Sequence, residues 1–107
     1  MKILNRRDFG VAVAAAILLP ATHARADDMD VHIDNFVFKP AELTVKVGTT
    51  VTWTNRDDIP HTVVSAGKFR SKTLDTDDKF SFTFTNAGDY RYFCSLHPHM
   101  TGMIKVE

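Results

Sequence analysis

Cysteine is nearly absent from this chain of 107 residues, which contains only Cys94. A single cysteine excludes an intramolecular disulfide, the usual means by which small exported domains are stabilised. It does not supply an ordinary structural zinc site either, because such sites typically use four cysteine and histidine ligands and no methionine. An unpaired thiol in an oxidising compartment is reactive unless something occupies it. We therefore expect a metal at Cys94, and its binding would also stabilise a small fold.

A long hydrophobic run is also missing. The main apolar stretch, residues 11–19, has nine residues, whereas a membrane-spanning helix needs about 20. It follows a basic N-terminus and precedes the small-residue segment ATHARA. This order predicts a cleaved export signal over residues 1–26, and NRRDFG resembles the twin-arginine motif; an ordinary Sec signal and a retained anchor are the alternatives. We expect a periplasmic protein without stable membrane insertion, with residues 27–107 as its mature domain.

The mature part has no excess of positive charge. It carries 9 lysines and arginines against 12 aspartates and glutamates, a net charge of about −3. Because no basic patch is present, nucleic acid is not an expected partner. Its 81 residues suffice for one small domain, which we expect to be a monomer.

Helical periodicity is absent from the mature part, and apolar residues alternate with polar ones instead. The alternating positions are Leu43, Val45 and Val47; Val51 and Trp53; Phe80, Phe82 and Phe84; and Tyr90, Tyr92 and Cys94. This pattern predicts about seven or eight short antiparallel strands in an all-β sandwich or small barrel. In the first strand the phase changes between Ile33 and Phe36, which predicts a β-bulge near residues 34–35.

Candidate metal ligands are concentrated in the segment RYFCSLHPHM, residues 91–100. Cys94, His97 and Met100 offer a thiolate, an imidazole and a thioether. Copper prefers this mixture, with two imidazoles and a thiolate in one plane and a weak axial thioether. Calcium and magnesium need oxygen-rich cages, which the sequence does not suggest.

A second imidazole must come from outside this segment, from His32 or His61. We favour His61, which stands where a loop enters an apolar strand. Pro60 fixes its own φ and restricts the residue before it, which gives a stiff entry for a ligand. His32 has the opposite parity to the apolar residues of the first strand, so we expect it to be solvated.

The segments VTWTNRDDIPHTVV and GDYRYFCSLHPHMTGMIKVE closely resemble the amicyanins, blue copper proteins of the plastocyanin/azurin (cupredoxin) family. The resemblance covers nearly the whole mature part. It implies a Greek-key β-sandwich of eight strands and one type 1 copper ion, bound by His61, Cys94, His97 and Met100. It also implies an electron carrier and not an enzyme. The implied partners are redox proteins: a c-type cytochrome, a periplasmic dehydrogenase, or both.

Two alternatives are kept beside this interpretation. Cys94, His99 and Met103 match the azurin-type spacing and define a second register for the same ion; we favour the shorter loop. A copper carrier or storage protein without electron transfer is the second functional hypothesis.

The sequence departs from the resembled pattern at two positions. Thr62 stands where relatives usually have asparagine, and we expect its hydroxyl to brace the cysteine loop in part. Leu96 stands where proline is common. It restores an N–H, and if that group points at the Cys94 sulfur it would stabilise the thiolate.

The resemblance further implies that His97 presents its imidazole edge at the surface, as the route for the electron. An apolar surface around it would suit the small, brief contacts of redox partners; its expected members are Ile59, Pro60, Leu96 and Pro98. The acidic clusters at residues 57–58 and 75–78 are expected to be solvated turns, with a docking surface for a basic cytochrome as the alternative.

Overall fold

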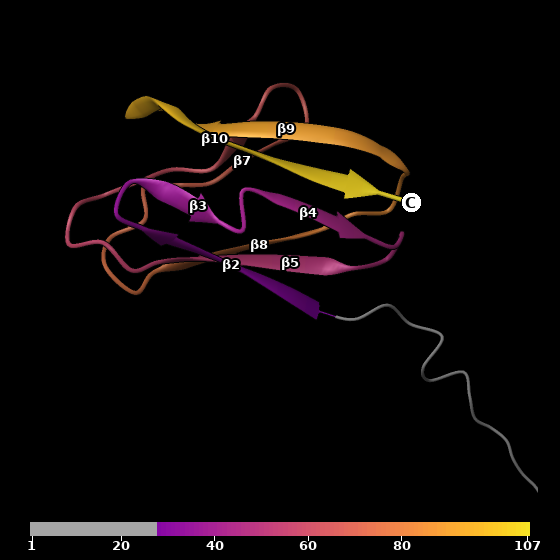
Figure 1. The fold of residues 1–107 in the computed structure, drawn as a ribbon, viewed down its shortest axis with the longest axis horizontal. Helices are drawn as coiled ribbons and strands as arrows, with labels where there is room; N and C mark the ends of the chain where they lie inside the picture. Colours follow the sequence, from indigo (N-terminus) through magenta and orange to yellow (C-terminus); the bar gives the residue numbers. More distant parts are fainter. Residues whose placement is uncertain (1–27) are drawn as a thin grey trace, which may run out of the picture.

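The computed structural model describes residues 28–107, which form two β-sheets packed face to face (Figure 1). The nine strands are β2 (Asp28–Asp34), β3 (Val37–Lys39), β4 (Glu42–Val45), β5 (Thr50–Asn55), β6 (Val64–Ser65), β7 (Phe69–Arg70), β8 (Lys79–Thr83), β9 (Gly88–Cys94) and β10 (His97–Val106). One sheet has the order β4-β10-β9-β6-β7, and the other has the order β3-β2-β5-β8. The chain crosses between the layers on entering β4, β5, β6, β8 and β9, as in Greek-key sandwiches.

The prediction of an all-β sandwich is confirmed, and two of its details are corrected. Residues 28–107 form nine strands where seven or eight were predicted, because β6 and β7 have only two residues each. The strands are not all antiparallel, since β2 pairs with β5 and β4 with β10 in parallel. Alternation reveals which face of a strand is buried, but it carries no information about the direction of the neighbouring strand.

No helix in the described part of the chain is long and apolar enough to cross a membrane. The predicted export signal, residues 1–26, lies outside the described residues.

The core is built from the alternating residues of both sheets. Trp53 is fully buried at its centre, and its ring contacts those of Phe69, Phe80, Phe84 and Tyr92. Aromatic side chains of this size supply most of the apolar area that a small domain can bury. Val47 was predicted to lie on the buried face with Leu43 and Val45, but it is exposed, because β4 already ends at Val45.

The predicted bulge at residues 34–35 is wrong, because a tight turn occupies this place. Asp34 pairs with Val37, so only Asn35 and Phe36 connect β2 to β3. Both have positive φ, 55° and 63°, as the turns of two-residue hairpins require. Asparagine tolerates this conformation, but a left-handed backbone costs a residue such as phenylalanine on the order of 1–2 kcal/mol. The hairpin, which sets Ile33 opposite Phe38, explains the change of phase.

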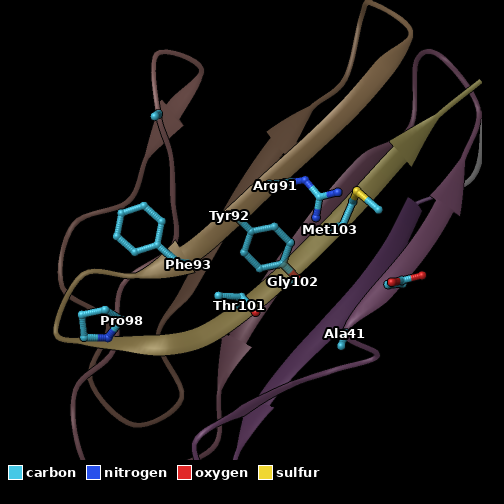
Figure 2. Close-up of a pocket in the computed structure, with 10 residues that line it drawn as sticks. Ala41, Arg91, Tyr92, Phe93, Pro98, Thr101, Gly102 and Met103 are labelled. Atoms are coloured by element: carbon cyan, nitrogen blue, oxygen red, sulfur yellow. The ribbon is translucent and has the colours of Figure 1, made fainter.

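Tyr92 is buried beneath the neighbouring strand. It lies opposite Gly102 in the β9–β10 pair, and Figure 2 shows its ring beside that glycine. A Cβ at Gly102 would lie 2.4 Å from the Tyr92 hydroxyl oxygen, so only glycine leaves room for the ring. The Tyr92 hydroxyl and the Trp53 Nε1 are buried without a hydrogen-bond partner among residues 28–107. Burial raises the pKa of Tyr92 to about 12, although the nearby indole N–H opposes the shift.

We expect Tyr92→Phe to stabilise the fold, most strongly in alkali. Removal of an unpaired buried hydroxyl should raise the free energy of unfolding by about 1 kcal/mol at pH 8. Above pH 10 the unfolded tyrosine loses its proton while the folded one keeps it to about pH 12. The wild type therefore loses about a further 1.4 kcal/mol at pH 11, a loss that the variant avoids.

Denaturant unfolding at pH 8 and pH 11 measures this difference. Tyr90→Phe is the control at pH 8, because the Tyr90 hydroxyl donates to the Asn86 carbonyl at 2.8 Å and its removal should destabilise. Equal losses between pH 8 and pH 11 in the wild type and Tyr92→Phe would refute the explanation.

Candidate metal centre

The backbone of His61 is fixed where the loop after β5 joins the sandwich. Its N–H donates to the Leu74 carbonyl at 3.1 Å, and its carbonyl accepts from the Leu74 N–H at 2.7 Å. The buried Asn55 side chain donates to the carbonyls of Ile59 and Leu74, both at 2.9 Å, and accepts from the Asp57 N–H at 2.9 Å. These bonds hold both ends of the loop, so His61 enters the site from a fixed position.

Cys94 and His97 lie at the adjoining ends of β9 and β10. They are register partners across a two-residue turn, residues 95–96. Period-two alternation along β9 places Cys94 on the same buried face as Tyr92, and its side chain is 0% exposed. The turn then returns the chain so that His97, which is partly exposed, adjoins the sulfur.

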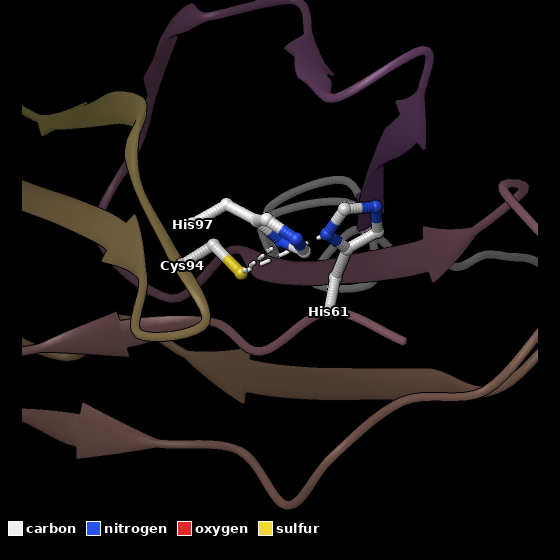
Figure 3. A group of neighbouring side chains, drawn as sticks. All are labelled: His61, Cys94 and His97. Atoms are coloured by element: carbon white, nitrogen blue, oxygen red, sulfur yellow. Dashed lines mark hydrogen bonds between the residues drawn. The ribbon is translucent and has the colours of Figure 1, made fainter. Parts of the chain in front are cut away.

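The side chains of His61, Cys94 and His97 point toward one another (Figure 3). The Cys94 Sγ lies 3.7 Å from the Nδ1 of each histidine, and all three ligand atoms are within 4.8 Å of one another. Two metal–ligand bonds of about 2.0–2.3 Å that meet at about 110–120° separate their donors by about 3.6–3.8 Å. The sulfur therefore lies from each of the two nitrogens at the distance expected of two ligands to a single ion.

Met100 is turned inward by an irregularity in β10. This strand pairs with β9 at His97 and again from Thr101 onward, but the register shifts between them. Met100 falls in the shifted segment and is only 5% exposed, within the same core cluster as Cys94. A buried thioether in this segment is the fourth donor that, with two imidazoles and a thiolate, makes up the set that copper prefers.

Asp57 holds the far side of the His61 ring. Its Oδ2 lies 2.8 Å from the His61 Nε2, and its carboxylate accepts the N–H groups of Asn35 at 2.6 Å and Phe36 at 3.0 Å. Burial by itself would raise the pKa of Asp57, but these two N–H groups and the imidazole outweigh it and leave the pKa below 3.8. The ionised carboxylate keeps the proton of His61 on Nε2, which leaves Nδ1 free for a metal.

Thr62 connects the His61 segment to the cysteine loop. Its Oγ1 accepts the Ser95 N–H at 2.8 Å and lies 2.8 Å from the Ser95 hydroxyl, so the bracing expected of Thr62 is confirmed. The Thr62 N–H also donates to the Cys94 Sγ at 3.4 Å. The N–H that would stabilise a thiolate thus comes from Thr62 and not, as the sequence suggested, from Leu96.

The residues of the alternative register lie apart from this site. His99 is exposed. Met103 lines a groove of about 520 Å³ on the outer surface, together with Arg91 and Thr101 (Figure 2). His32 is exposed on β2, as the sequence predicted. The arrangement of side chains therefore favours the shorter loop.

Phe36 is a residue of the site that the sequence did not identify. Its ring meets those of His61 and His97 edge to face, with centroids 5.4 Å and 4.9 Å apart. Phe36 is 44% exposed and Leu96 is 50% exposed. The expected apolar surface near His97 therefore includes a member from the β2–β3 turn. In the sequence, the only feature that pointed to Phe36 was the Asn–Phe pair that follows an alternating strand.

The acidic clusters are largely engaged in local structure. Arg56 and Asp77 form an ion pair at 2.8 Å, and the Asp78 carboxylate accepts the Asp75 N–H at 2.9 Å. Asp57 is bonded to His61 and the β2–β3 turn. These contacts favour the interpretation of the clusters as turns.

Comparison with known proteins agrees with this geometry. The family model of the cupredoxin-like domain matches residues 9–106, and the chain belongs to this family. Amicyanin of Paracoccus versutus is 34% identical over 103 residues, covering 91% of this chain and 78% of that protein. A chloroplastic plastocyanin of Tetradesmus obliquus is 35% identical over 113 residues, covering 92% of this chain and 77% of that protein.

A solved structure of the Cu(I) form of an amicyanin mutant is also similar. It superposes with a TM-score of 0.72 at 38% sequence identity, covering 74% of this chain and 81% of that chain. The resemblance seen in the sequence is thereby confirmed.

Proposed function

We propose that this protein is a periplasmic one-electron carrier that binds one type 1 copper ion through His61, Cys94, His97 and Met100. The observation that carries the proposal is the spacing of the two histidine Nδ1 atoms, each 3.7 Å from a fully buried sulfur. When bound, copper supplies a centre that alternates between Cu(II) and Cu(I). Membership of the cupredoxin-like family supports the choice of metal, as does the similarity to an amicyanin structure in its Cu(I) form.

The residues around the site suit rapid electron transfer because they restrict its movement. Cys94 and His97 share one two-residue turn. His61 is held through its backbone by Leu74 and through its ring by Asp57. Side chains fixed by packing and hydrogen bonds keep their positions when the charge at the centre changes. Little reorganisation is then needed in either direction, as an electron carrier requires.

His97 gives the electron its route to the surface. His61, Cys94 and Met100 are buried, whereas His97 is partly exposed. Exposed apolar side chains, including Leu96 in the adjoining turn, provide a surface for brief contact with another protein. The proposed partners are redox proteins, namely a c-type cytochrome, a periplasmic dehydrogenase or both. Delivery to the periplasm would be directed by residues 1–26 as an export signal, which is then removed.

Protein film voltammetry of the copper-loaded protein tests the proposal together with its visible spectrum. An electron carrier should show an intense visible absorption band and a reversible one-electron wave. A copper carrier or storage protein for Cu(I) should show neither. Absence of both in protein that contains one copper per chain would replace the proposed function with the storage alternative.

A further inference from the structure

The β2–β3 turn places an aromatic ring in an unfavourable backbone conformation directly beside the site. Two-residue turns with positive φ at both central positions favour glycine at the second position. This chain has Phe36 there, with φ at 63°. The ring is also 44% exposed, so burial in the core does not explain the choice of residue.

The same carboxylate that orients one histidine also holds this turn. The Asp57 carboxylate accepts both turn N–H groups, from Asn35 at 2.6 Å and from Phe36 at 3.0 Å, and its Oδ2 bonds the His61 Nε2 at 2.8 Å. A further bond, from the Arg56 N–H to the Ile33 carbonyl at 2.7 Å, ties the end of β2 to the same loop. Phe36 and His61 are therefore positioned relative to each other through one acceptor.

The three rings form a compact cluster. Phe36 stands nearly perpendicular to both imidazoles, at 87° to His61 and 82° to His97. The two imidazole centroids are themselves 5.0 Å apart. Edge-to-face contacts of this kind restrict the rotation of a ring. These contacts matter most for His97, because its ring is partly exposed and its Nε2 makes no hydrogen bond within residues 28–107.

We infer that Phe36 is a positioning residue that clamps the imidazoles of His61 and His97 and shields the metal position between them from small anions and water. The inference rests on the proposed function, since it concerns access to the copper. It goes beyond that function by assigning the shield to a turn that contributes no ligand. The unfavourable backbone of Phe36 is then the cost of placing an aromatic ring where glycine would suit the turn better.

Three variants of one turn separate this role from a purely structural one. Phe36→Gly relieves the backbone and deletes the ring, whereas Asn35→Gly relieves the backbone at the neighbouring position and keeps the ring. Both retain the backbone N–H groups that bond Asp57. Phe36→Leu keeps an apolar side chain but removes the aromatic edge.

The first measurement is azide binding to the oxidised, copper-loaded protein, followed by visible and electron paramagnetic resonance spectra. We expect Phe36→Gly to bind azide about tenfold more tightly than the wild type, because the ring no longer shields the metal from the anion. A factor of this size corresponds to the loss of one or two edge-to-face contacts. Phe36→Leu should be intermediate, and Asn35→Gly should stay within about twofold of the wild type.

The second measurement uses metal-free protein, so it does not depend on copper. The carbon-bound imidazole protons of His97 should carry ring-current shifts from both Phe36 and His61 in the NMR spectrum. Phe36→Gly should remove the Phe36 contribution, and Asn35→Gly should preserve it. If the wild type shows the blue band but Phe36→Gly and Asn35→Gly bind azide with equal affinity, the shield is overturned and the proposed function stays intact. A wild type that binds copper without that band would overturn the proposed function and the shield with it. Unchanged His97 shifts in Phe36→Gly would refute the clamp whatever the metal does.

Discussion

Replacement of Cys94 by serine is expected to abolish the intense visible absorption of the copper-loaded protein. The band depends on a thiolate bonded to copper, and a hydroxyl oxygen is a harder and much weaker ligand for this metal. The variant should also bind copper less tightly, because it loses the sulfur that lies 3.7 Å from the Nδ1 of each histidine. Ultraviolet–visible titration of the metal-free protein with Cu(II) measures both changes.

The same titration tests the register of the ligands. His97→Ala should lose the band, whereas His99→Ala should keep it, because His99 is exposed and outside the cluster. The two histidines are separated by one residue, so the pair is closely matched in position. A band that survives His97→Ala and disappears with His99→Ala would favour the azurin-type spacing. Retention of the band in Cys94→Ser would contradict the proposed site altogether.

Replacement of Asp57 by alanine is expected to be the most damaging change outside the ligands. It removes one acceptor that serves three donors, namely the N–H groups of Asn35 and Phe36 and the His61 Nε2. The Asp57 side chain is only 11% exposed, so water replaces these bonds poorly. We expect the metal-free variant to lose about 2–4 kcal/mol of unfolding free energy. Its copper affinity should fall about 10–100-fold, since the His61 ring loses its orienting partner.

Asp58→Ala is the matched control for this prediction. Asp58 adjoins Asp57 and carries the same charge, but it is exposed. Its removal should change the unfolding free energy by no more than about 0.5 kcal/mol. Denaturant unfolding of the metal-free proteins and competition titration with a copper chelator compare the two variants. Similar behaviour of Asp57→Ala and Asp58→Ala would refute the assigned role of Asp57.

The sequence predicted the parts of the fold that depend on burial. Alternation identified the inward faces of β5, β8 and β9, including Trp53 and Cys94, because a side chain on the core face must be apolar or paired. It could not predict the parallel β2–β5 and β4–β10 pairs, since strand direction depends on how the chain crosses between layers. The phase change between Ile33 and Phe36 was attributed to a bulge, and the two-residue turn found there was not predictable, because phenylalanine rarely adopts a positive φ.

The metal-binding donors of the candidate site were predictable because three of them lie close together in the sequence with a recognisable spacing. Cys94, His97 and Met100 lie within seven residues, and His61 was selected by the stiff loop before it. The supporting contacts were not predictable in the same way. Asp57 lies in a run of acidic residues that is typical of a solvated turn, and Phe36 reaches the histidines from a turn that lies 25 residues before His61.

X-ray absorption at the copper edge of the oxidised, copper-loaded protein tests the central claim most directly. We predict one sulfur and two imidazole nitrogens in the first coordination shell, at about 2.0–2.3 Å, with the sulfur lost in Cys94→Ser. A first shell made only of nitrogen and oxygen in the wild type would contradict the assignment of this site.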